Sequence, residues 1–245
     1  MLESRRQSVL LVVFALLMVV LTTLVYRKFY IGLAGDSEFS AAGLLGQSNQ
    51  PVDRFDLSNA VVPVEQIRSG GPGVDGIPAI TDPKLLAAGE ATFLRPTDQV
   101  IGVVFNDEAR AYPVRALDYH EVVNDRIGDV PFAVTYCPLC DSSAVFDRRH
   151  KEGVFEFGVS GRLYNSNVLM YDRPSSPNST LWSQVRSGGI SGPRVSESLR
   201  ALPVEVVAWE DWKTRHPDTK VLALDQLRTQ SLNVSPYAIY FRSRL

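Results

Sequence analysis

The sequence predicts a mainly β (α+β) fold: a single globular domain rich in antiparallel strands, with a few short helices, preceded by one N-terminal transmembrane helix. Three observations predict it. Short runs of alternating apolar and polar residues recur through the body of the chain and are separated by Gly, Pro, Asn and Asp. Helical patterns in that body are short, and the clearest of them occurs near its end. The first part of the chain has no charged residue between Arg6 and Arg27.

The uncharged run from Gln7 to Tyr26 is dominated by Val, Leu, Phe and Met. As a helix it spans roughly 30 Å, the thickness of the hydrocarbon core of a bilayer. The residues that follow, Tyr26-Arg27-Lys28-Phe29-Tyr30, lack the small-residue cleavage site of a signal peptide and suit the lipid headgroups. We therefore expect a single-pass anchor at 7–26 in the cell membrane, a cytoplasmic tail at 1–6 and an extracytoplasmic body.

The composition of the rest of the chain predicts three segments: a tether, a folded domain and a C-terminal extension. Residues 27–56 are rich in Gly, Ala, Ser, Asn and Gln and predict a juxtamembrane tether. Residues 57–225 are expected to form the folded domain, and residues 226–245 a C-terminal extension. The whole chain has 25 basic and 27 acidic residues, with no basic stripe, which argues against a nucleic-acid partner.

The elements of the domain follow from local patterns. Residues 70–78, rich in Gly and Pro, predict an extended loop. A short helix is predicted over 82–90, because Thr81 or Asp82 can cap it and proline is tolerated in its first turn. Residues 100–105 and 109–114 predict a hairpin that turns at 106–108. Further strands are predicted at 132–136, 144–147, 154–159, 168–171 and 204–207, and a helix at 209–215 that ends before His216-Pro217.

The only two cysteines, Cys137 and Cys140, stand in the sequence Tyr-Cys-Pro-Leu-Cys-Asp between two of these strands. A C-x-x-C pair can bind a metal, cycle between dithiol and disulfide, or form a fixed disulfide. A disulfide that closes so short a loop stabilises by only about 2 kcal/mol, so metal binding or redox exchange is favoured. The β pattern after Cys140 argues against a helix that begins at the pair, and a turn between strands is typical of a metal-binding knuckle.

Two cysteines do not complete a metal site, and His120 is the best additional ligand among the three histidines. It lies one expected strand and one turn before Cys137. Met170 is the only methionine outside the N-terminal segment, and a thioether would favour copper over zinc. The ordinary alternatives are a buried or capping histidine and a methionine that fills the core. We predict copper or zinc at Cys137, Cys140, His120 and Met170, with Glu121 orienting the histidine.

A polar segment within apolar surroundings, residues 157–173, supplies candidate pocket residues. Its glycines and asparagines fit a tight turn between strands. In the functional alternative, Arg162, Tyr164 and Asn165 line a pocket beside the cysteines, with Trp182 as a wall. The chain has no G-x-S-x-G motif or Ser-His-Asp order to support a hydrolase.

Several ordered motifs together resemble a prokaryotic family called domain of unknown function 3179, over about residues 56–224. These motifs occupy residues 75–80, 119–125, 134–140, 157–161, 171–173, 181–184 and 216–219. The family often has glycine and tryptophan where this chain has Asp141 and Tyr119. The resemblance implies no settled activity. It implies that His120, Cys137 and Cys140, together with residues 158–172, match the motif core of the family. Asn124, within the motif at 119–125, is a further candidate for the pocket.

Three hypotheses follow for the function. The leading one is a membrane-anchored extracytoplasmic domain that binds copper or zinc and passes it to a metal-receiving partner protein. The second is a thiol–disulfide oxidoreductase in which Cys137 attacks, Cys140 resolves, His120 lowers the thiol pKa and a redox partner supplies the disulfide. The third is a non-catalytic module that holds a small ligand in its Asn, Tyr and Trp pocket. The sequence does not decide whether the protein is an enzyme.

Overall fold

The computed structural model of the chain describes residues 55–173, 179–224 and 235–238, together with Met18, Thr22 and Tyr240. Two compact units are present, residues 1–40 and 41–245. In the first unit Met18 and Thr22 are helical, and the Thr22 hydroxyl donates to the Met18 carbonyl at 2.8 Å. The predicted tail, the rest of the anchor and the tether up to residue 54 lie outside the described residues. No helix within the described ranges has both the length and the apolar character of a membrane span.

The described part of the second unit is mainly β and mostly antiparallel, which confirms the predicted class. Its helices are η1 (Val64–Gln66), α3 (Val114–Leu117) and α4 (Trp209–Arg215). Its strands are β1 (Ile67–Ser69), β2 (Ile80–Thr81), β3 (Leu85–Ala87), β4 (Gln99–Phe105), β5 (Glu108–Pro113), β6 (Val122–Ile127), β7 (Val130–Cys137), β8 (Ser142–Asp147), β9 (Arg149–His150), β10 (Gly153–Val154), β11 (Glu156–Tyr164), β12 (Asn167–Arg173), β13 (Leu181–Ser183), β14 (Gly188–Ser191), β15 (Glu205–Ala208) and β16 (Lys220–Leu222).

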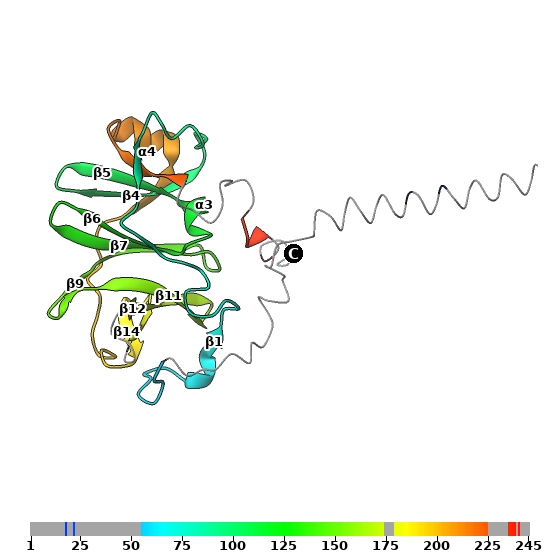
Figure 1. Cartoon of the computed structure of the whole chain (residues 1–245), viewed down its shortest axis with the longest axis vertical. Helices are drawn as coiled ribbons and strands as arrows, with labels where there is room; N and C mark the ends of the chain where they lie inside the picture. Colours follow the sequence, from blue (N-terminus) through cyan, green and yellow to red (C-terminus); the bar gives the residue numbers. More distant parts are fainter. Residues whose placement is uncertain are drawn as a thin grey trace, which may run out of the picture. The chain divides into compact units, whose positions relative to one another are not determined.

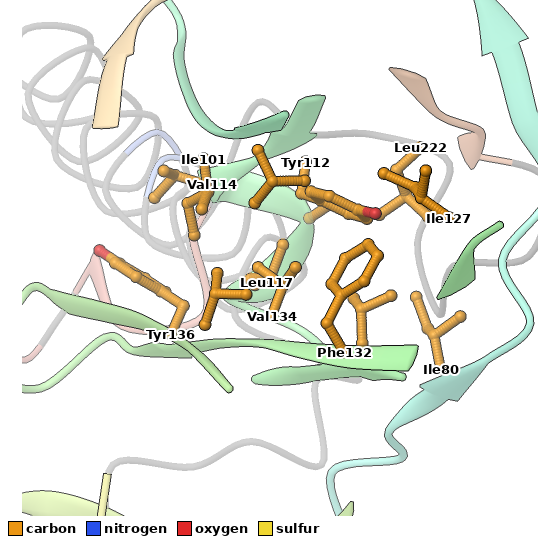
Figure 2. Close-up of a cluster of buried hydrophobic side chains, with 14 residues drawn as sticks. Ile80, Ile101, Tyr112, Val114, Leu117, Ile127, Phe132, Val134, Tyr136 and Leu222 are labelled. Atoms are coloured by element: carbon orange, nitrogen blue, oxygen red, sulfur yellow. The ribbon is translucent and has the colours of Figure 1, made fainter. Parts of the chain in front are cut away.

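Three sheets are stacked in this unit (Figure 1). The upper sheet has the strand order β15-β4-β5-β16-β3, the middle sheet β2-β6-β7-β8 and the lower sheet β1-β11-β12-β13-β14. Apolar side chains fill both spaces between them. Tyr112 of the upper sheet and Phe132 of the middle sheet belong to one core (Figure 2). Phe146 of the middle sheet and Phe157 of the lower sheet belong to the next.

The middle sheet is therefore buried on both faces. Alternation along each strand sends one side chain up and the next down, as with Val123 and Val122 on β6. A polar residue in such a strand must find its hydrogen-bond partner on a neighbouring sheet. Asn124 binds the main-chain N–H and C=O of Phe157 below, each at 2.8 Å. Asp125 binds Arg110 above at 2.6 Å, so side-chain hydrogen bonds tie the three layers together.

Several predicted elements are confirmed. The hairpin of β4 and β5 turns at Asn106 and Asp107, which both have positive φ, as a two-residue type I′ turn requires. Gly128, with φ of 55°, reverses the chain between β6 and β7. The late helix is α4, which packs Trp209 and Trp212 into an apolar cluster with residues of the upper sheet.

The helix predicted over 82–90 is wrong. Residues Leu85–Ala87 form β3, which pairs antiparallel with β16 at the edge of the upper sheet. The Ala223 N–H extends this ladder by donating to the Lys84 carbonyl at 3.0 Å. So short a helix has little stability of its own, and the sheet edge offers the same backbone groups a paired partner.

Candidate functional site

The cysteines lie in a tight turn between two strands, as the sequence predicts. Cys137 ends β7, and β8 begins at Ser142. The Cys140 N–H donates to the Cys137 carbonyl at 3.3 Å, which closes a β-turn with Pro138 at its second position. Asp141 follows with φ of 47°. Such a turn brings its first and last Cα atoms within about 7 Å, close to the range that a disulfide spans.

The two thiols have different environments. Cys137 is 1% exposed and packs in the core between the middle and lower sheets, whereas Cys140 is exposed. Burial, and then the hydrogen bond with Cys140, raise the pKa of the Cys137 thiol to about 12. Its Sγ contacts the Ser166 carbonyl at 3.5 Å. Cys137 is thus a neutral thiol beneath an accessible one.

Two polar side chains contact the Cys140 sulfur, and a third holds both of them. The Ser142 Oγ lies 3.0 Å from Cys140 Sγ, and the Asn167 Nδ2 lies 3.3 Å from it. Both also donate to Oε1 of Gln184, each at 2.8 Å. Gln184 in turn donates through Nε2 to Thr135 and to the Ser142 carbonyl, each at 3.1 Å. We call Ser142, Asn167 and Gln184 the sulfur cradle.

A hairpin turn places Asn167 of the cradle beside the cysteines. Asn165 and Ser166 join β11 to β12 with φ of 50° and 59°, while Tyr164 and Asn167 pair across the turn, which is a type I′ arrangement. The turn places the Ser166 carbonyl against Cys137 and the Asn167 amide against Cys140. Sequence reasoning identified this turn but did not assign Ser142 or Asn167 to the site, because their roles depend on contacts with distant strands.

A buried acidic group lies near Cys137. Glu121 has φ of 55° where the chain passes from α3 into β6, and its carbonyl accepts the Tyr136 N–H at 2.8 Å, one residue before Cys137. The Tyr237 hydroxyl donates to Glu121 Oε1 at 2.7 Å. Burial raises the pKa of Glu121 to about 7, and Asp118 adds to the increase, while the Tyr237 hydrogen bond opposes it.

This acidic group includes two further residues. Burial raises the pKa of Asp118 to about 6. Burial, followed by the charge of Glu121, raises the pKa of Tyr237 far above its usual range. Tyr237 comes from the predicted C-terminal extension, which no motif in the sequence connected to the cysteines. The described part of that segment is therefore packed against the residues beside the site.

The predicted metal ligands lie as follows. His120 is buried, and its Nδ1 lies 2.7 Å from the Pro78 carbonyl. Because a carbonyl only accepts, Nδ1 carries the proton, and in the neutral ring Nε2 bears the lone pair. Met170 is fully buried in the core that also holds Cys137 and Trp182. Within the described ranges no three His, Cys, Asp or Glu side chains are grouped so that they could hold one metal ion. The copper or zinc site stays a prediction.

The residues predicted to line a pocket have different environments in the structure. Asn124 is occupied by the main chain of β11, as described above. Trp182 is buried with Phe157, in an edge-to-face contact at 6.4 Å between ring centroids. Arg162 and Tyr164 are half-buried on β11, and Asn165 is exposed in the turn. The small-ligand pocket stays a prediction.

Comparison with known protein families gives a match over most of the chain. The model of a family described as a protein of unknown function, DUF3179, matches residues 74–245. The matched range includes the cysteines, the sulfur cradle and Tyr237. No curated protein and no solved structure was found to be similar to the chain.

Proposed function

Because the chain belongs to the DUF3179 family of proteins of unknown function, its activity has to be inferred from its own residues, and we propose that it exchanges thiols and disulfides through Cys137 and Cys140. One observation carries the proposal. A single β-turn sets an exposed thiol, held by polar side chains, beside a buried thiol. An oxidoreductase of the dithiol type needs this asymmetry, with one sulfur that meets the substrate and one that resolves the intermediate.

In this proposal the two cysteines exchange the roles that we expected from the sequence, because Cys137 is buried and Cys140 is exposed. In the proposal, the Cys140 thiolate attacks one sulfur of a substrate disulfide, and the other sulfur leaves as a thiolate and takes up a proton. Cys137 then loses its proton and attacks Cys140 Sγ, which forms the Cys137–Cys140 disulfide and releases the second substrate thiol. The protein is oxidised by two electrons and the substrate disulfide is reduced by two. The reverse sequence transfers a disulfide to a dithiol substrate.

The second step requires a proton acceptor, because burial keeps Cys137 protonated at neutral pH. We assign that role to Glu121. Its charge acts on the Cys137 thiol, its backbone is hydrogen-bonded beside Cys137, and its pKa of about 7 lets it take up a proton near neutral pH. Tyr237 donates to the carboxylate and holds it in place.

The proposed location is consistent with this chemistry. An anchor at 7–26 with an extracytoplasmic body, as the sequence predicts, would place the pair in an oxidising compartment, where disulfides persist. The substrate in this proposal is a disulfide or dithiol carried by a redox partner protein at the membrane surface.

Trapping the mixed disulfide tests the proposal. The full-length protein is reduced and exposed to oxidised glutathione as the probe. Thiols are counted, and adducts are located by mass spectrometry. We expect the wild type to lose both thiols without retaining glutathione. Cys137→Ser should accumulate one glutathione on Cys140, and Cys140→Ser should acquire little, because Cys137 is buried.

Two results would overturn the proposal. In one, both thiols of the wild type persist in excess oxidised glutathione. In the other, Cys137→Ser and Cys140→Ser are modified equally. Elemental analysis of the same reduced preparation tests the predicted metal. About one copper or zinc per chain, lost in either cysteine variant, would assign the pair to metal binding instead.

A further inference from the structure

We propose that Asn167 is a positioning residue that fixes the Cys140 sulfur and, together with Ser142, raises the reduction potential of the Cys137–Cys140 pair. This inference rests on the thiol–disulfide exchange proposed above. It identifies the side chains that set how readily the protein gives up its disulfide.

Main-chain groups fix the direction of each hydrogen bond in the cradle. The Val185 N–H donates to Asn167 Oδ1 at 3.2 Å, so the amide cannot flip without placing N–H against N–H. Nδ2 of Asn167 therefore faces Cys140 Sγ and Gln184 Oε1. The Ser142 carbonyl fixes Gln184 in the same way, because only Nε2 of Gln184 can donate to it.

Burial holds these amides in place. Asn167 is 2% exposed and Gln184 is 1% exposed, whereas Cys140, which Asn167 contacts, is an exposed residue. Their hydrogen bonds join β12, the end of β13, the first residue of β8 and, through Thr135, β7. Movement of Asn167 would break bonds to several strands at once. The Asn167 donor thus stays aimed at Cys140 whether the sulfur is a thiol or a thiolate.

The Ser142 hydroxyl suits both states of the sulfur. While Cys140 is a thiol, its S–H can donate to Ser142 Oγ, and the Ser142 O–H donates to Gln184 Oε1. When Cys140 is a thiolate, the Ser142 O–H can rotate by one rotamer to donate to the sulfur. Gln184 Oε1 still keeps the Asn167 donor, so no buried acceptor is left unsatisfied.

The consequence for the redox equilibrium follows from charge. Hydrogen bonds to a charged group are stronger than those between neutral groups, and a disulfide sulfur carries no charge. Donors aimed at Cys140 therefore stabilise the reduced pair more than the oxidised pair. A disulfide between Cys137 and Cys140 is then easier to reduce than it would be without the cradle.

The decisive variant is Asn167→Asp. An aspartate keeps the shape of the side chain and the oxygen that accepts the Val185 N–H, but it replaces the donor to sulfur by an acceptor. We expect the thiol–disulfide equilibrium constant to shift at least about tenfold toward the disulfide, which is about 30 mV lower in potential.

Ser142→Ala gives an independent test and covers the case in which Asn167→Asp does not fold. It removes the hydroxyl beside the sulfur and should shift the equilibrium in the same direction. Ser143→Ala is the matched control, because the adjacent serine on β8 directs its side chain to the opposite face of the strand. It should leave the potential unchanged.

The measurement is the redox equilibrium of the full-length protein against glutathione buffers, read as the fraction of free thiol. If the wild type and Ser143→Ala cycle while Asn167→Asp and Ser142→Ala show the same potential as the wild type, the role of the cradle is refuted and the exchange proposal survives. A wild type that forms no disulfide in any buffer refutes the exchange proposal and the inference with it. A lower potential in either folded cradle variant, with Ser143→Ala unchanged, supports the inference.

Discussion

Replacing Glu121 by glutamine should remove a large part of the pH dependence of stability. Glu121 is 6% exposed, and burial raises its pKa from the ordinary 4.5 to about 7. Between these two values the folded protein keeps a proton that the unfolded chain has lost. The free energy of unfolding therefore falls as pH rises from 4.5 to 7. The rise of the Glu121 pKa from 4.5 to about 7 corresponds to about 3 kcal/mol of the free energy of unfolding. About 2–3 kcal/mol of this is lost between pH 5 and pH 8.

In Glu121→Gln the side chain is neutral at every pH, and its oxygen can still accept the Tyr237 hydroxyl. We expect the wild type and the variant to have similar stability at pH 5. At pH 8 the variant should be the more stable by about 2–3 kcal/mol, because the wild type then buries a charge. Urea denaturation at half-unit pH steps, followed by the fluorescence of the buried Trp182 and Trp212, measures both curves.

Comparison of the variants separates the contribution of Glu121 to the pH dependence of stability from that of Asp118. Burial also raises the pKa of Asp118, to about 6, so a smaller slope below that pH should remain in Glu121→Gln. Glu210→Gln, on the exposed side of α4, is the control and should follow the wild-type curve. A constant difference between wild type and Glu121→Gln from pH 5 to pH 8 would refute the reasoning, since the carboxyl would then titrate alike in folded and unfolded chains.

Three further outcomes are expected. In the native protein at pH 8 iodoacetamide should label Cys140 far faster than Cys137, because a pKa of about 12 rather than 9 lowers the thiolate fraction of Cys137 roughly a thousandfold; mass spectrometry of timed samples checks this. Gly102→Ala should destabilise by about 1–3 kcal/mol in urea denaturation, because the added Cβ would lie 2.3 Å from the Trp212 ring. Asn124→Ala should lower the melting temperature, at a cost of about 2–4 kcal/mol, because two buried main-chain groups of β11 lose their partners.

The parts of the fold that the sequence predicted correctly are those fixed by local chemistry. Asn106 and Asp107 tolerate the positive φ of a two-residue turn, so the hairpin of β4 and β5 could be recognised from the turn residues and the flanking alternation. The turn that holds Cys137 and Cys140 was recognised in the same way. Residues 82–90 were wrongly predicted as a helix, because they suit a helix locally. Residues Leu85–Ala87 form β3 only through pairing with β16, more than 130 residues later.

In the candidate site, too, local sequence predicted some features, and others depend on contacts with distant parts of the chain. The C-x-x-C motif identified the cysteines, but the sequence offered no means of telling which thiol is buried. That difference depends on the lower sheet, which covers Cys137 and supplies Asn167 to Cys140. Tyr237 could not be assigned for the same reason, because it lies 116 residues after its partner Glu121 and no periodic pattern connects them.

The stacking of three sheets explains why a buried and an exposed cysteine lie together at this position. The middle sheet packs against another sheet on each face, and β7 is buried from Pro131 to its last residue, Cys137. The chain must leave the sheet to turn into β8. Cys140, three residues after Cys137, lies in that turn and is exposed. A pair with one buried and one exposed sulfur thus follows from placing C-x-x-C across the end of a buried strand. The same motif in an exposed turn would have two equivalent thiols, with no distinction between attacking and resolving sulfur.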